Sequence, residues 1–246
     1  MRTIGIIGGM SAESTALYYA RLNAEARRRL GELHSAEVLI WSVDFAEIAD
    51  MQSRGAWDDA GRRLADVARR LERGGAEVLI LATNTMHKVA ETIQAAVRIP
   101  LLHIADATAK CVATAGCKRP GLLGTRYTME QEFYKGRITS RFGLDVLVPD
   151  EADRAEAHRV VYDELCRGVV QADSKRAFET IAERLVERGA DCLILGCTEV
   201  GMLLDQPNVR VPVFDTTLIH ADAALDWALA AHSASSKQEG ATGTHG

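Results

Sequence analysis

The chain has 246 residues, of which 47% are hydrophobic and 26% are charged, and this composition is ordinary for a globular protein with a substantial core. Its net charge of −5 excludes the strongly basic surface that nucleic-acid binding usually needs. No apolar run approaches the ~20 residues of a membrane-spanning helix. We therefore expect neither a nucleic-acid partner nor a membrane partner.

The amino-terminal stretch MRTIGIIGGM has a short apolar run that glycines close, and this pattern favours a first β-strand over a signal peptide. The number of cysteines is five, which is odd, and this favours free thiols in a reducing, cytoplasmic environment. The cysteines form no C-x-x-C pair, so the sequence predicts no metal site.

Short runs rich in Ile, Val and Leu alternate along the chain with longer segments of helical spacing. Strands are expected, in chain order, at residues 3–8, 37–43, 76–82, 100–104, 120–124, 144–149, 191–196 and 211–215. Helical spacing is clearest at residues 60–76, 176–190 and 217–230. Continuous apolar strands that alternate with helices predict an α/β fold whose parallel sheets are covered by helices.

The two halves of the sequence also align with each other. The stretch GAEVLILATNT pairs with GADCLILGCTE, so that Gly75 matches Gly189 and Thr83 matches Cys197. In the same way, RIPLLHIADAT pairs with RVPVFDTTLIH, and TIGIIGG pairs with RPGLLGT. We interpret these matches, which occur in the same order in both halves, as a duplication that produced two lobes of similar fold.

The predicted fold class is therefore α/β, with two pseudo-symmetric lobes, each a four-stranded parallel sheet flanked by helices, and an active site in the cleft between them. The first lobe is expected to contain residues 1–104 and 215–232, and the second lobe residues 105–214. Residues 233–246 have no apolar period and are predicted to be a disordered tail.

Thr83 and Cys197 follow matching strands, and ligands of open parallel sheets bind beyond the carboxyl ends of the strands. If the lobes face each other, these two side chains meet one ligand from opposite sides. Inversion of a carbon centre requires this arrangement, because one group removes a proton and the other delivers one to the opposite face. A thiol suits the role, since its pKa of about 8.5 falls near a helix N-terminus, and we expect a helix to begin after Cys197.

The motifs IGIIGGMS, TNTMHK, LLGTRYTMEQ and LGCTEVG resemble those of the aspartate/glutamate racemase family, in the same order and over nearly the whole chain. The form GCTE, in place of GCTH, is similar to the aspartate-racemase-like branch. The resemblance implies cofactor-independent racemisation of acidic amino acids, aspartate and/or glutamate, by two opposed acid/base residues. It also implies that no cofactor is needed and that the protein is a homodimer.

Thr83 departs from this pattern, because the family usually has a cysteine at that position. Carried over by the resemblance, Cys197 is the base that takes the Cα proton of the L-enantiomer, and Thr83 stands where the proton donor for the other face should be. A threonine hydroxyl is a far weaker acid than a thiol and cannot rest as an anion near neutral pH. Our hypothesis is an asymmetric racemase that favours L-substrates.

Further polar residues beside the two catalytic candidates are expected to bind the substrate. Asn84 and Thr198 would donate hydrogen bonds to a carboxylate, and Glu199 would orient a neighbour or hold the substrate ammonium. The full set of predicted substrate-binding residues is Met10, Gln52, Asn84, Thr85, Thr125, Thr198 and Glu199.

Other functions are compatible with the same motifs. A one-thiol enzyme of the same superfamily, either a decarboxylase of the arylmalonate type or a hydantoin-type racemase, would also use Cys197. A non-catalytic shell that binds an acidic metabolite is a further alternative, because Thr83 replaces a catalytic thiol. A nucleotide loop at GIIGGMS is disfavoured, since the stretch lacks G-x-G-x-x-G.

Overall fold

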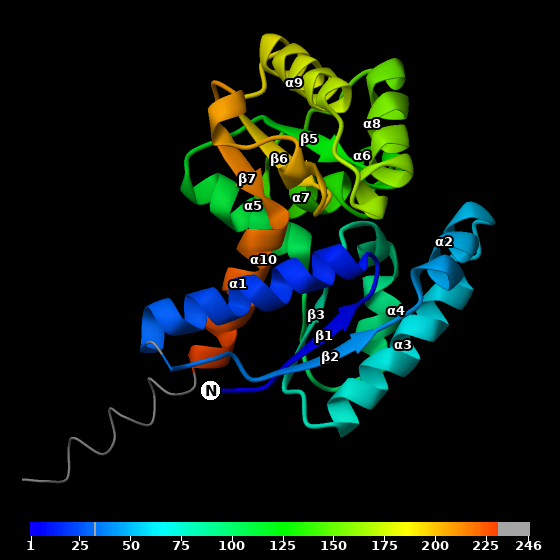
Figure 1. Cartoon of the computed structure of the whole chain (residues 1–246), viewed down its shortest axis with the longest axis vertical. Helices are drawn as coiled ribbons and strands as arrows, with labels where there is room; N and C mark the ends of the chain where they lie inside the picture. The colour runs from blue at the N-terminus through cyan, green and yellow to red at the C-terminus, as the bar shows by residue number, and fades with distance from the viewer. Residues whose placement is uncertain (32, 231–246) are drawn as a thin grey trace, which may run out of the picture.

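The computed structural model describes residues 1–31 and 33–230, and the predicted tail at 233–246 lies outside these residues. Figure 1 shows two lobes, each with a parallel sheet and covering helices, stacked along the long axis of the molecule. Among the helices described, none is long and apolar enough to cross a membrane.

The first lobe contains a four-stranded parallel sheet with the order β2-β1-β3-β4. Its strands are β1 (Ile4–Gly8), β2 (Val38–Ser42), β3 (Val78–Leu81) and β4 (Leu101–Leu102). Its helices are α1 (Ala12–Leu30), α2 (Phe45–Ser53), α3 (Trp57–Arg73), the 3₁₀ helix η1 (Thr85–Val89) and α4 (Ala90–Ala95). The central strands β1 and β3 are buried on both faces, which explains their continuous apolar sequence.

The second lobe contains a three-stranded parallel sheet with the order β5-β6-β7. Its strands are β5 (Pro120–Gly124), β6 (Cys192–Gly196) and β7 (Val213–Asp215). The α-helices of this part of the chain are α5 (Ile104–Thr114), α6 (Arg126–Glu130), α7 (Lys135–Phe142), α8 (Glu151–Asp163) and α9 (Ala172–Glu187). Short 3₁₀ helices are η2 (Leu165–Arg167), η3 (Val200–Met202) and η4 (Gln206–Asn208).

The fourth strand expected in the second lobe, at residues 144–149, is reduced to a single bridge. Leu147 lies parallel to β5, donates from its backbone N–H to Pro120 O at 2.9 Å and accepts from Leu122 N at 2.8 Å. The next donor in this ladder would be the residue at 149, and Pro149 has no backbone N–H. This short pairing, in which Asp145 N also donates to Lys118 O at 2.9 Å, therefore ends at Pro149. The second sheet has three strands where the first has four.

Equivalent glycines show the relation between the lobes in atomic detail. Gly5 on β1 lies opposite Leu79 on β3, and Gly121 on β5 lies opposite Leu193 on β6. A methyl group added at Gly5 or at Gly121 would lie 2.7 or 2.8 Å from a leucine Cδ2 atom, so a larger residue at either position would displace the facing leucine. The sequence matches therefore correspond to the same packing solution in both sheets.

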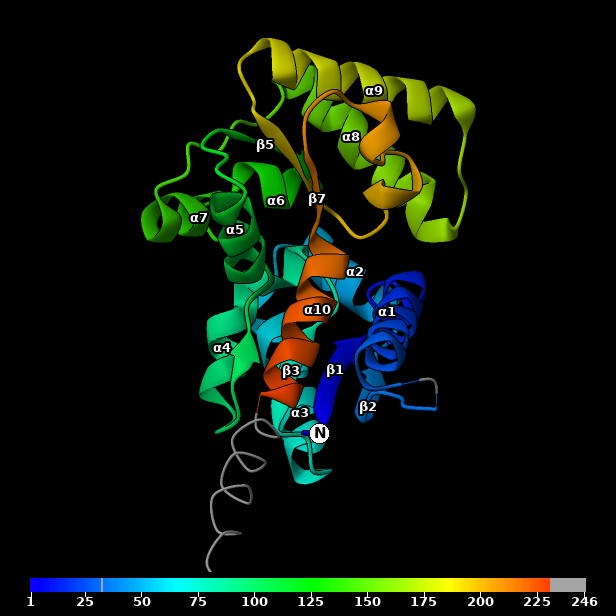
Figure 2. The same ribbon diagram turned by 90° about the vertical axis from the view of Figure 1, so that its left-hand side faces the viewer.

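The last helix, α10 (Thr216–Leu229), leaves β7 of the second lobe and packs on the first. Figure 2 shows it running past β3 and β1. Its Ala221, Ala224, Leu225 and Ala228 belong to one buried cluster with Ile4 and other residues of the first lobe. This packing agrees with the assignment of the segment to the first lobe, while the exact domain boundaries stay a prediction.

Candidate active site

The carboxyl ends of the strands of both lobes meet at one cavity with an empty volume of about 350 Å³. All the side chains predicted for the site line it: Met10, Gln52, Thr83, Asn84, Thr85, Thr125, Cys197, Thr198 and Glu199. The two catalytic candidates come from equivalent strand ends, since Thr83 follows β3 and Cys197 follows β6. Geometry alone does not assign their roles, which stay predictions.

The remaining lining residues are ones that the sequence reasoning missed: Phe45, Val161, Tyr162, Cys166 and Gly196. Phe45 begins α2 directly after β2, so its position at a strand end was a usable signal. Tyr162 and Cys166 come from the end of α8 and from η2, and no strand-end pattern points to them. Only the packing of the second lobe brings that segment back to the cavity.

Glu199 is the centre of a buried hydrogen-bond network beside the Cys197 thiol. The thiol of Cys197 donates to Glu199 Oε2 at 2.9 Å, and the hydroxyl of Thr198 donates to the same oxygen at 2.6 Å. Ser11 and Ser14, at the start of α1, donate to Glu199 Oε1 at 2.7 and 3.0 Å. Because α1 belongs to the first lobe, this carboxylate joins the lobes where the thiol lies.

The pKa of the Cys197 thiol is raised well above its ordinary value, first by burial and then by the nearby Glu199 and Cys166. The expectation of a helix that favours the thiolate is therefore wrong. Only the single turn η3 follows Cys197, and it begins at Val200. The thiol holds its proton and donates it to Glu199.

The backbone at Thr83 is held by a buried histidine. His87 Nδ1 lies 2.8 Å from Thr83 O, and His87 Nε2 accepts from Ile104 N at 3.2 Å. Since Nε2 is an acceptor, Nδ1 carries the proton and donates it to Thr83 O. Burial lowers the pKa of His87 well below its ordinary value, so the ring stays neutral in this arrangement.

The amide of Asn84 leaves one acceptor for a ligand. Thr216 donates its only hydroxyl proton to Leu195 O at 2.7 Å, and it must therefore accept from Asn84 Nδ2, at 3.0 Å. This bond fixes the orientation of the amide, and Asn84 Oδ1 is buried without a hydrogen-bond partner. An N–H or O–H group of a bound molecule would satisfy this oxygen.

Two further hydrogen bonds cross from lobe to lobe at the cavity wall. The hydroxyl of Tyr162 donates to Gln52 Oε1 at 3.0 Å. The hydroxyls of Thr85 and Thr125 lie 3.0 Å apart. Each pair combines one residue from either lobe, so the wall depends on the relative position of the two.

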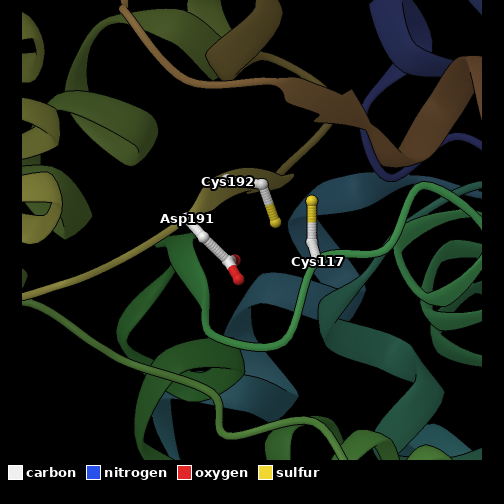
Figure 3. Close-up of side chains that lie close together, drawn as sticks. All are labelled: Cys117, Asp191 and Cys192. Atoms are coloured by element: carbon white, nitrogen blue, oxygen red, sulfur yellow. The ribbon is translucent and has the colours of Figure 1, made fainter.

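Cys117, Asp191 and Cys192 form the one cluster of potential metal ligands in the part of the chain that the structure describes. Their ligand atoms lie within 4.8 Å of one another, and Figure 3 shows them converging. The Asp191 carboxylate also accepts from Lys118 N at 2.6 Å and from Arg119 N at 3.0 Å, so it braces this loop. The cluster lies at the start of β6, at the opposite end of the strand from Cys197.

Comparison with known proteins agrees with this geometry. Residues 7–224 match the family model described as Asp/Glu/Hydantoin racemase. The broad specificity amino-acid racemase RacX of Bacillus subtilis is 25% identical over 233 residues, which cover 92% of this chain and 98% of that protein.

Solved structures are similar over nearly their full length. A candidate Asp/Glu racemase from Yersinia pestis is 48% identical with a TM-score of 0.87, covering 93% of this chain and 100% of that one. An aspartate racemase homologue from Pyrococcus horikoshii is 34% identical with a TM-score of 0.80, covering 93% and 99%. The chain therefore belongs to the Asp/Glu/hydantoin racemase family of isomerases.

Proposed function

We propose that this protein racemises free amino acids without a cofactor, with Cys197 and Thr83 acting on opposite faces of the substrate Cα. The observation that carries the proposal is the position of these two residues. They follow equivalent strands of two related lobes, and both line one cavity. A substrate bound between the lobes would have one of them on either side.

The network around Glu199 supports a route for the first proton transfer. Glu199 Oε2 accepts the thiol proton of Cys197 at 2.9 Å, and transfer of that proton would generate the thiolate. The thiolate then removes the Cα proton of an L-amino acid, which leaves a carbanion. Thr83 donates its hydroxyl proton to the opposite face and recovers one from water, and Glu199 then gives the proton that it took from the thiol to the hydroxide left behind.

Asn84 suits the substrate ammonium group. Its Oδ1 atom is a buried acceptor without a partner, and an ammonium hydrogen would satisfy it. The hydroxyls of Thr85 and Thr125, which are hydrogen-bonded to each other at 3.0 Å, would give up this bond and both donate to the α-carboxylate. The three contacts together would fix the Cα between the thiol and the threonine.

The expected preference for L-substrates follows from the unequal pair. Thr83 is a poor base for a D-amino acid, since its hydroxyl is not ionised near neutral pH. The sequence resemblance implies acidic substrates, and relatives named aspartate or glutamate racemase support that reading. The relative RacX is named for broad specificity, so the substrate panel must extend beyond aspartate and glutamate.

Proton NMR in D₂O tests the proposal directly. Purified protein is incubated with L- and D-amino acids without added cofactor, and loss of the Cα–H signal is followed together with a chiral assay. We expect loss of signal and appearance of the D-form from L-substrates, and no reaction with Cys197→Ala.

Each alternative function gives a different result. Exchange without inversion would mean that Cys197 works alone, and release of CO₂ from a malonate derivative would indicate a decarboxylase of the one-thiol type. Binding of an acidic metabolite without any Cys197-dependent exchange would instead support a non-catalytic shell.

A further inference from the structure

The candidate active-site cavity lacks a cationic side chain. Among the described residues that line it there is no lysine or arginine, and the charged residue present is an acid, Glu199. Arg126 and Arg167 follow lining residues in the sequence, but both are exposed. Arg159 on α8 is engaged by Glu156 and Glu164, at 2.8 and 2.9 Å.

Nearby groups add no positive charge to the cavity. The pKa values of Cys197, Tyr162 and Cys166 are all raised, in each case first by burial. The electrostatic neighbours that raise them further are carboxyl, thiol and phenol groups, with Glu199 acting on all three. A second negative charge would meet the same surroundings.

An amino acid with an acidic side chain would bring such a charge. Its α-ammonium and α-carboxylate balance each other, but the side-chain carboxylate adds one uncompensated negative charge to a cavity without a cationic side chain. A buried carboxylate is strongly unfavourable unless a cation or several donors pair with it. The hydroxyl pair of Thr85 and Thr125 can serve one carboxylate, and every amino acid already has one.

Gln52 and Tyr162 line the cavity and offer hydrogen-bond partners for an uncharged polar group. Gln52 Nε2 donates to Met86 Sδ at 3.0 Å and keeps a second hydrogen for an acceptor. The Tyr162 oxygen, whose proton goes to Gln52 Oε1, can accept a hydrogen bond. Phe45, Val161 and Met10 complete this wall with apolar surface. Amide and hydroxyl groups match these partners without bringing a charge.

A basic side chain fits less well. Glu199, the acid that could pair with it, already accepts hydrogen bonds from Ser11, Ser14, Thr198 and Cys197. It also lies beside the reacting thiol, so the substrate groups near it are those at Cα. The far end of a lysine-like side chain would reach away from this carboxylate.

We propose that the preferred substrates are amino acids with a short, uncharged, hydrogen-bonding side chain, and not aspartate or glutamate. This inference rests on the proposed racemase function and names its substrate class. It departs from the acidic substrates that the sequence resemblance implies. The cavity contains the proposed reacting residues, Cys197 and Thr83, but no cationic side chain that could pair with a second carboxylate.

Matched substrates that differ mainly in charge provide the test. Cα–H exchange in D₂O is measured for L-asparagine against L-aspartate, and for L-glutamine against L-glutamate, with L-serine and L-lysine added. We expect kcat/KM to be at least about ten-fold higher for each amide than for its acid, which corresponds to a modest difference in binding free energy. Cys197→Ala serves as the control that assigns exchange to this site.

A charge introduced at the wall gives a second, independent test. Gln52→Lys adds a cation where the side chain of the substrate is expected, and Gln52→Met, of similar length, adds none. We expect the ratio of glutamate to glutamine turnover to rise at least about ten-fold in Gln52→Lys relative to Gln52→Met. Circular dichroism and a thermal melt confirm that both variants fold.

The outcomes separate the two proposals. Cys197-dependent exchange that is as fast for the acids as for the amides overturns the substrate class and leaves the racemase function intact. A preference for lysine over serine and the amides also overturns it, in favour of basic substrates. If no amino acid exchanges, the proposed function and the substrate class both fail.

Discussion

Thr83 and Cys197 follow equivalent strands of the two lobes, but only Cys197 has a group acidic enough for a neighbouring base to deprotonate. Cys197 can act as a base and, once protonated, as an acid. Thr83 can act only as a donor. Because Thr83 stands in place of a second thiol, the proposed reaction would be efficient on L-substrates only. A single substitution at Thr83 should remove this limit.

Thr83→Cys is expected to increase Cα–H exchange of D-amino acids by about 10²-fold or more, in the range that a positioned acid/base group contributes. The new thiol would provide the base that the D-enantiomer lacks. The measurement is proton NMR in D₂O with a D-substrate that the wild type handles poorly. Thr83→Val keeps the shape without the hydroxyl and should retain L-exchange while losing inversion. Unchanged D-exchange in Thr83→Cys would show that Thr83 is not the second catalytic position.

Glu199→Gln is expected to lower the pKa of the Cys197 thiol. The negative charge of Glu199 is, after burial, the main cause that raises this pKa, and glutamine removes the charge while keeping an acceptor. The alkylation rate of Cys197 by iodoacetamide, followed against pH, should shift toward lower pH. Thr198→Val, a change beside Glu199 that preserves its charge, should shift the profile less. A shift toward higher pH in Glu199→Gln would contradict this reading of the network.

The sequence alone identified residues that line the cavity where a polar or reactive side chain follows a strand. Asn84, Thr125 and Cys197 all follow apolar strands, so the rule for parallel sheets was enough to bring them together. Tyr162 and Cys166 have no such signal, since they reach the cavity from α8 and η2. The raised pKa of Cys197 was also out of reach, because it depends on burial and on the direction of the Glu199 side chain.

The close approach of β5 and β6 at their carboxyl ends sets the distance between the site residues that follow them. Gly124 at the end of β5 pairs with Gly196 at the end of β6, directly before Thr125 and Cys197. A methyl group at Gly124 would lie 2.7 Å from Gly196 O. Two glycines therefore allow the two strand ends, and the site residues after them, to approach closely.

Gly124→Ala is expected to separate these strand ends and to reduce turnover more than stability. The added methyl group meets backbone, which cannot rotate away, and such overpacking costs about 1–3 kcal/mol. Urea unfolding and kcat/KM are measured together. Gly136→Ala is the control, because its methyl group would meet the movable end of Glu132. Full activity in Gly124→Ala would show that the spacing of the strand ends is not critical.

Most elements were predictable because apolar runs and helical spacing are local. The fourth strand of the second sheet was not, although residues 144–149 have the composition of a strand. Its hydrogen-bonded pairing with β5 stops at Pro149. Whether one missing backbone N–H ends a strand depends on which residue of the neighbouring strand it would face. Register is a property of the pair of strands and not of either sequence alone.

On the scale of the whole molecule, polar contacts between the lobes gather around the cavity. The pairs Ser11–Glu199, Thr85–Thr125 and Tyr162–Gln52 each join one lobe to the other. The proposed substrate binding would therefore be coupled to the relative position of the lobes through the same side chains. The homodimer implied by the family resemblance stays a prediction that light scattering of the purified chain can test.

Three histidines form a further cluster, packed ring to ring. The ring centroid of His87 lies 4.5 Å from that of His103 and 5.7 Å from that of His220. These residues come from η1, the start of α5 and α10. His220 accepts from Tyr18 at 2.8 Å and donates to Leu102 O at 2.9 Å, so this network requires a neutral ring.

A decrease in pH should therefore lower the free energy of unfolding through protonation of these histidines. Burial lowers the pKa of His103 and of His220 from 6.5 to about 3. Between these values the unfolded chain binds more protons than the folded chain, so the free energy of unfolding falls as pH decreases from 6.5 toward 3. Each such histidine contributes up to about 1.4 kcal/mol per pH unit.

His220→Gln isolates one member of the cluster. Glutamine can accept from Tyr18 and donate to Leu102 O, but it does not titrate. Urea unfolding at several pH values below 6.5 should give a pH slope that is smaller than that of the wild type by up to about 1.4 kcal/mol per pH unit. His34→Gln, at an exposed position, is the matched control and should leave the slope unchanged. If His220→Gln loses stability at pH 7 yet keeps the wild-type slope, the ring has a packing role, and the acid sensitivity arises elsewhere in the molecule.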